Sequence, residues 1–151
     1  LPGAWEELNL SHPSEENPCP IDPALWTCFA GASNEEQPAA ASDGDIFLVV
    51  WSDWRNAERD IYGARVTRTG IVLDTASIQI CAATGAQYNP AVEYDGTNFL
   101  VIWEDVRNGE YDLYGARVTP QGTVLDTFFV VTQQGYQISP VLSRGSGNKM
   151  L

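Results

Sequence analysis

The stretch WSDWRNAERDIYGARVT at residues 51–67 decides the fold, because it recurs as WEDVRNGEYDLYGARVT at residues 103–119. The likeness extends on both sides of this stretch. Between residues 38–75 and 90–127, 24 of the 38 aligned positions are identical without a gap. The two copies lie 52 residues apart (90 minus 38). An internal repeat of this length is typical of folds in which each copy is one supersecondary unit packed on its neighbours.

Each copy predicts four β-strands. In the first copy they begin after Pro38 and cover residues 47–51, 60–67 and 77–82. The Asp-Gly pair at 43–44 connects the first two strands, since glycine adopts the positive φ of tight hairpins. The second strand is apolar on both faces, as expected between two layers. The third alternates in polarity.

The repeat also predicts the organisation of the chain. We expect an irregular leader (1–24), a strand of a preceding unit (25–37), a first repeat (38–82), a second repeat (83–134) and the start of a third (135–151). Residues 85–90 reappear at 135–140 with a spacing of 50. The sequence ends where an apolar strand should begin, which indicates a piece of a longer array.

The string W-x-D-x-R-N…D-[IL]-Y-G-A-R-V resembles the β-propeller-type tandem repeats of large secreted or surface-anchored bacterial proteins. The resemblance covers about residues 25–151. It implies an all-β fold of four-stranded antiparallel blades, here about two and a half blades of an incomplete ring. The alternative is a stacked-sheet or β-sandwich array.

Composition excludes several classes of partner. The net charge is −12 with only eight lysines and arginines, so we expect no nucleic acid partner. No apolar run approaches the ~20 residues that span a bilayer, so we expect no membrane insertion. The aromatic fraction of 11% and hydrophobic fraction of 44% indicate a packed core.

Three cysteines are present. Cys19 and Cys28 bracket a short loop with two prolines and predict a disulfide if the protein is secreted; the alternative is a pair of reduced buried thiols. Cys81 lies in an apolar strand and predicts a buried, inert thiol.

Two pairs of carboxylates stand out at the hairpins between the second and third strands. Pairing Trp51 with Tyr62 places Asp53 opposite Asp60 across the hairpin. Arg55 follows two residues after Asp53, so its planar fork is expected to bridge both carboxylates as a structural clasp.

The second copy repeats this pattern with Asp105, Arg107 and Asp112. The alternative interpretation of both sets is calcium, which prefers carboxylate and carbonyl oxygens; the arginine argues against it because a guanidinium repels the ion. We expect no catalytic role for these carboxylates, because they occur in both copies whereas an active site needs one special position. No other cofactor is predicted.

Trp54 has no aromatic counterpart, because Val106 stands at its place in the second copy. An exposed indole in this loop is a candidate for ligand contact, against the simpler role of covering its own sheet.

Taken together, the sequence predicts a non-enzymatic, secreted or cell-surface structural and interaction module in a surface layer, fibre or large secreted complex. Its partners would be another protein or further copies of itself that complete the propeller. The alternatives are a carbohydrate-binding, lectin-like propeller and an accessory domain of a larger secreted enzyme.

Overall fold

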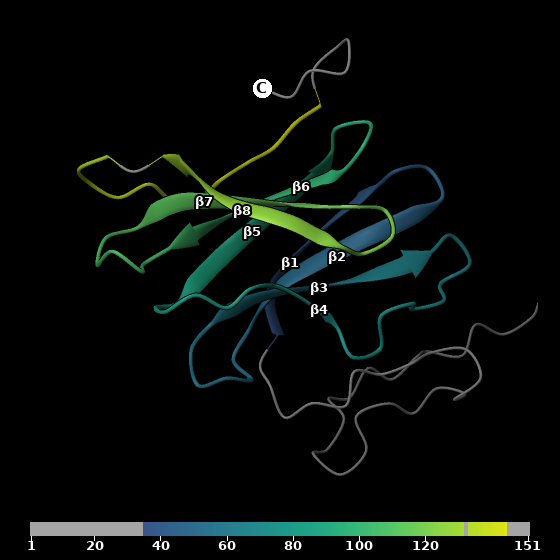
Figure 1. Cartoon of the computed structure of the whole chain (residues 1–151), viewed down its shortest axis with the longest axis horizontal. Helices are drawn as coiled ribbons and strands as arrows, with labels where there is room; N and C mark the ends of the chain where they lie inside the picture. Colours follow the sequence, from purple (N-terminus) through teal and green to yellow (C-terminus); the bar gives the residue numbers. More distant parts are fainter. Residues whose placement is uncertain (1–34, 132, 145–151) are drawn as a thin grey trace, which may run out of the picture.

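The computed structural model describes residues 35–131 and 133–144. It contains eight strands, namely β1 (Glu35–Ser42), β2 (Ile46–Asp53), β3 (Asp60–Thr67), β4 (Ile78–Cys81), β5 (Gln87–Tyr94), β6 (Phe99–Asp105), β7 (Asp112–Val118) and β8 (Val124–Val131). They form two four-stranded antiparallel sheets, each in chain order (Figure 1). The prediction of an all-β chain with four strands per repeat is thereby confirmed.

The predicted Asp-Gly turns connect β1 to β2 and β5 to β6. Gly44 has a φ of 108° and Gly96 a φ of 103°, a region that favours glycine. The Asp43 carboxylate closes the first turn by accepting the backbone N–H groups of Asp45 and Ile46, each at 2.8 Å.

The first strand of each copy differs from the prediction, because it begins before the proline. β1 starts at Glu35, and its pairing with β2 shifts register between Glu36 and Ala39. The proline has no N–H to donate to the ladder, and Gln37 before it has a φ of 56°. The strand therefore passes the proline as a β-bulge and continues.

The fourth strands also differ between the copies. In the first sheet, Ser77 has a φ of 63° and its N–H bonds to the carbonyl of Asp74 at 2.9 Å, which makes a turn before β4. In the second sheet, β8 runs from Val124 to Val131. The shorter path explains why the spacing between copies falls from 52 to 50 residues after this point.

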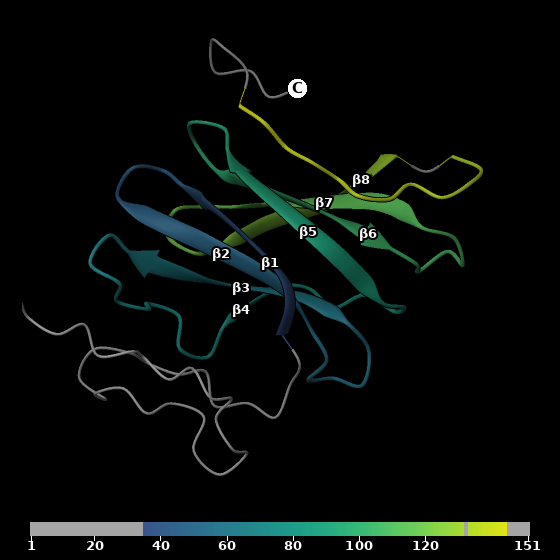
Figure 2. The ribbon, with the colours of Figure 1, turned by 180° about the vertical axis from the view of Figure 1, so that it is seen from behind.

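The two sheets pack face to face, and β5 of the second lies beside β1 of the first (Figures 1 and 2). We call the side of a sheet that faces the next repeat its leading face, and the opposite side its trailing face. The core joins the leading face of the first sheet to the trailing face of the second. The buried residues of the core include Leu48, Val50, Ile61 and Ile80 on the leading face, and Phe99, Val101, Trp103, Ala116 and Val118 on the trailing face.

The same hydrogen bonds attach each following segment to the preceding hairpin. Gln87 donates its N–H to the carbonyl of Arg59 at 2.7 Å, and Gln137 donates to the carbonyl of Tyr111 at 2.8 Å. We call these two places the first and second junctions. Residues 133–144 therefore join the second sheet as residues 83–94 join the first.

The predicted leader (1–24), most of the preceding strand (25–37), the Cys19–Cys28 disulfide and the end of the third copy lie outside the described residues. Within the described ranges, no helix is long and apolar enough to cross a membrane.

Candidate functional site

The hairpin between β2 and β3 has the register that the sequence predicts. Trp51 pairs with Tyr62, and Asp53 pairs with Asp60. The second hairpin repeats this arrangement, with Asp105 paired to Asp112. All four carboxylate residues are buried.

Arg55 is the main partner of Asp53. Its backbone N–H donates to Asp53 Oδ1 at 2.8 Å and its Nε to Oδ2 at 2.9 Å, while Nη2 forms an ion pair with the same carboxylate. The indole Nε1 of Trp51 also donates to Oδ2, at 3.1 Å. The guanidinium lies 4.0 Å from the centre of the Tyr62 ring. The fully buried carboxylate therefore has its charge compensated and its oxygens occupied.

The opposite carboxylate is held by another residue, which corrects the prediction that arginine bridges both. The amide Nδ2 of Asn56 donates to Asp60 Oδ2 at 2.8 Å and to the Tyr62 hydroxyl at 2.8 Å. Of the two carboxylates, the guanidinium bonds only to Asp53, because its stacking on Tyr62 and its bonds along that carboxylate fix its plane. Asn56 and its counterpart Asn108 are thus members of the clasp that the sequence interpretation missed, although both copies contain them.

The pKa values of the two facing carboxyl groups are shifted in opposite directions. Burial raises the pKa of Asp53, but the hydrogen bonds from Arg55 and Trp51 outweigh it and hold the pKa below its ordinary value of 3.8. Burial raises the pKa of Asp60, and the hydrogen bond from Asn56 offsets only part of that rise. The difference follows from the partners, since one group has a guanidinium and the other a neutral amide.

The second clasp uses the same contacts and lies at the boundary between the sheets. Arg107 donates through Nε to Asp105 at 2.8 Å and stacks on Tyr114 at 3.9 Å, while Asn108 donates to Asp112 at 3.0 Å. The Nη2 atom of Arg107 also lies 3.5 Å from the Cys81 sulfur of the first sheet. This clasp therefore links the repeats as well as its own hairpin.

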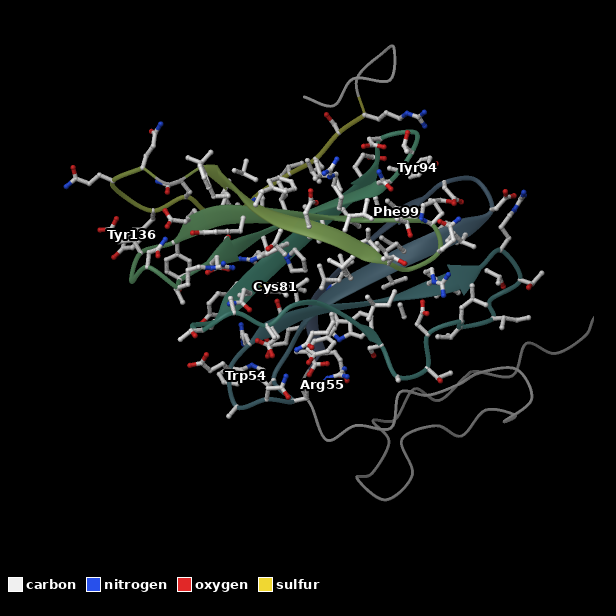
Figure 3. The ribbon with its side chains drawn as sticks, viewed as in Figure 1. Trp54, Arg55, Cys81, Tyr94, Phe99 and Tyr136 are labelled. Atoms are coloured by element: carbon white, nitrogen blue, oxygen red, sulfur yellow. The ribbon has the colours of Figure 1, made fainter. Side chains whose placement is uncertain are left out.

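Cys81 is a buried free thiol between the two sheets, as predicted (Figure 3). Burial raises the pKa of this thiol above its ordinary value. The protonated form is favoured, and the thiolate is the reactive species. Among the described residues, no group of three or more His, Cys, Asp or Glu side chains could hold a metal ion.

Trp54 projects from the first hairpin with 42% of its surface exposed (Figure 3). The guanidinium of Arg59 lies 5.0 Å from the centre of the Trp54 ring. The same guanidinium lies 5.0 Å from the ring of Tyr88 in β5 and pairs with Glu36. The first junction thus contains a cation between two aromatic rings.

The second junction has a cavity of about 370 Å³ where the first has this ion pair. It is lined by Tyr88, Asn89, Glu104, Tyr111, Tyr136, Ile138 and Ser139. The ring centres of Tyr88 and Tyr111 are 5.9 Å apart, and those of Tyr111 and Tyr136 are 5.7 Å apart. The sequence interpretation did not identify this site, because its residues differ between the copies.

A second arginine–aspartate pair recurs in both sheets and was also missed. Arg65 holds Asp74 with two parallel bonds of 2.8 Å, from Nε and Nη2. Arg117 and Asp126 form the corresponding pair in the second sheet. The signal was present, since both charges recur at the same spacing in each copy.

No protein-family model, curated protein or solved structure matches this chain.

Proposed function

We propose that this chain is a non-enzymatic, extracellular interaction module of β-propeller type, a scaffold whose repeats pack on further copies of the same repeat. The single observation that carries the proposal is that equivalent positions differ in burial. Ile80 on the leading face of the first sheet is 3% exposed because the second sheet covers it. Its counterpart Val130 is 42% exposed, and Phe128, the counterpart of Ile78, is 36% exposed.

The trailing face of the first sheet supports the same proposal. It has an apolar cavity of about 210 Å³, lined by Glu35, Pro38, Val49, Trp51, Ala64 and Val66. The counterparts in the second sheet are Gln87, Pro90, Val101, Trp103, Ala116 and Val118. All of these counterparts are buried, whereas in the first sheet only Trp51 and Ala64 are buried and the other four lining residues are half-buried or exposed. The two outer faces are therefore complementary, since each has the side chains that its partner meets inside the molecule.

Such faces join head to tail, because a leading face meets a trailing face. Association of this kind makes a ring where the rotation closes and a filament where it does not. Both outcomes suit a structural element of a surface layer, fibre or large secreted complex. The charge of −12 favours solubility outside such contacts. The non-enzymatic part of the proposal is supported by the burial of the four clasp carboxylates and by their hydrogen bonds to arginine or asparagine.

Sedimentation velocity tests the proposal. The mass of the 16.5 kDa chain is expected to rise with protein concentration, and Val130→Asp is expected to abolish the rise. Phe129→Asp is the matched control, because its counterpart Gln79 stays exposed even where a neighbour is present. A mixture of Val130→Asp and Val66→Asp chains, each with one intact face, should give a one-to-one dimer. A chain that stays monomeric at every concentration, while folded by circular dichroism, contradicts the proposal.

A further inference from the structure

We propose that the cavity at the second junction binds a small organic cation, such as a quaternary ammonium or a guanidinium group. This inference does not depend on the proposed scaffold function, because every residue that forms the cavity belongs to this chain.

The carboxylate of Glu104 is buried at this cavity. This residue lines the cavity and is only 3% exposed. Its Oε1 accepts hydrogen bonds from Asn89 Nδ2 at 2.8 Å and from the Ser139 N–H at 2.6 Å, both neutral donors. No lysine or arginine in the described ranges forms an ion pair with it. A buried carboxylate without a counter-charge favours the binding of a cation.

The first junction contains a cation from its own chain, the guanidinium of Arg59. There the acceptor for the next repeat is the neutral amide of Gln37, which takes the Asn89 N–H at 3.0 Å and the Ser52 hydroxyl at 3.3 Å. The charges of Arg59 and Glu36 cancel as an ion pair. The first junction therefore already contains its own cation, and that cation has its counter-charge.

The two junctions have different residues at three equivalent positions. Tyr111 stands in place of Arg59, Tyr88 in place of Glu36, and Glu104 in place of Ser52. The guanidinium is lost, a carboxylate is gained, and aromatic rings replace both members of the ion pair. The second junction thus has the groups that surround a cation, but among the described residues no guanidinium takes the place of Arg59 there.

The aromatic rings of the cavity suit a weakly hydrated cation. The faces of aromatic rings carry negative potential, and such rings recognise quaternary ammonium and guanidinium groups. Tyr136, which is 72% exposed, lies at the outer edge, at the opposite end of the sheet from Tyr94 and Phe99 (Figure 3). A ligand can therefore enter past Tyr136 and reach the carboxylate. The cavity of about 370 Å³ falls within the size range of small-molecule sites.

Isothermal titration of the full chain tests the proposal with four probes. Choline represents a free cation and N-acetylarginine amide represents a protein side chain, so the two probes distinguish the sources. The uncharged isostere 3,3-dimethyl-1-butanol tests for the charge, and methyl α-glucoside tests for a sugar. We expect at least one of the cations to bind and both neutral compounds to bind at least about tenfold more weakly, the loss expected for one charge-assisted contact.

Three variants locate the site. Glu104→Gln keeps an oxygen that can accept the bonds from Asn89 and Ser139 but removes the charge, so it should weaken cation binding about tenfold. Tyr111→Arg installs the residue of the first junction and should block binding with an internal guanidinium. Glu93→Gln is the control, because it removes one negative charge outside the cavity and should leave the affinity unchanged.

The result that would overturn the proposal is unchanged cation affinity in Glu104→Gln. Equal binding of choline and its neutral isostere, or binding of the glucoside without either cation, would overturn it as well. Tyr136→Ala gives a second readout if Glu104→Gln fails to fold, since this exposed residue can be removed without disturbing the core. The proposed function fails or holds separately, through the concentration dependence of mass.

Discussion

The leading faces of the two sheets are built from equivalent positions, yet the two faces differ in burial at their fourth strands, β4 and β8. Ile80 is 3% exposed in the first sheet, and Val130 is 42% exposed at the same place in the second. The side chains are similar, so the difference comes from the neighbour and not from the strand. Burial in a repeat protein belongs to the interface between copies, and each copy contributes half of it.

The largest effect is expected where a clasp also belongs to such an interface. Asp105→Ala leaves the guanidinium of Arg107 and the indole N–H of Trp103 without their buried acceptor. Removing one partner of a buried pair should lower the free energy of unfolding by about 4 kcal/mol. Urea denaturation followed by fluorescence measures the change.

The first clasp provides the comparison for this variant. Asp53→Ala should cost less than Asp105→Ala, because only Arg107 also contacts Cys81 across the sheets. Equal losses would mean that each clasp stabilises only its own hairpin. Asp126→Ala, in the exposed pair with Arg117, should change stability little and serves as the control.

The next largest loss of stability is expected at β4, and it should exceed the loss at the equivalent position of β8. Ile80→Ala removes a buried side chain from the core and should lower the free energy of unfolding by about 3 kcal/mol. Val130→Ala should change it by less than about 0.5 kcal/mol in the monomer, because its site is exposed. Thermal unfolding at low protein concentration measures both. Similar losses would show that Val130 packs within its own sheet as tightly as Ile80 packs between sheets.

A smaller loss of stability is expected when the glycines on the two leading faces, Gly63 and Gly115, are replaced by alanine. A Cβ on Gly63 would lie 2.9 Å from the Val49 carbonyl oxygen and 3.0 Å from the Ile80 side chain, both fixed in the core. Gly63→Ala should therefore cost about 2 kcal/mol.

Gly115→Ala tests the same position in the second sheet. The added Cβ would lie 3.0 Å from the Val101 carbonyl oxygen and 3.1 Å from the Phe128 ring. The exposed ring can move aside, so the loss should be smaller than for Gly63→Ala in denaturant titrations. A larger loss at Gly115 would contradict the view that the leading face of the second sheet is free.

The same distinction explains what the sequence could predict. The repeat fixes strand pairing, so Asp53 opposite Asp60 followed from alternation and turn length alone. It did not predict that Asn56 holds Asp60, because hydrogen-bond partners depend on the orientation of the guanidinium plane. Nor did it reveal the cavity around Glu104. Identical positions mark the packing that both copies share, whereas this cavity is built where the copies differ.

The smallest predicted effect concerns pH and compares the two carboxyl groups of the first hairpin. The pKa of Asp53 is lowered in the folded state, so the unfolded chain takes up this proton first as pH falls. The contribution of Asp53 to stability is present above pH 3.8 and is lost as the pH falls through the lower pKa of the folded state. The pKa of Asp60 is raised, so the folded chain takes up that proton first, and stability is gained as pH falls toward 3.8.

Two amide variants should therefore change the pH dependence in opposite directions. The deficit of Asp53→Asn relative to the parent chain should be largest at pH 7 and should shrink near pH 3, because the parent loses the ionised pair there. Asp60→Asn keeps an oxygen that can accept the bond from Asn56. The stability of this variant relative to the parent chain should be highest at pH 7, because the parent chain then has an ionised, buried Asp60 whose protonated form is favoured. Urea titrations at the two pH values measure both differences. Parallel pH dependence in the two variants would mean that the arginine neutralises both carboxylates, which returns the clasp to the symmetrical arrangement that the sequence predicted.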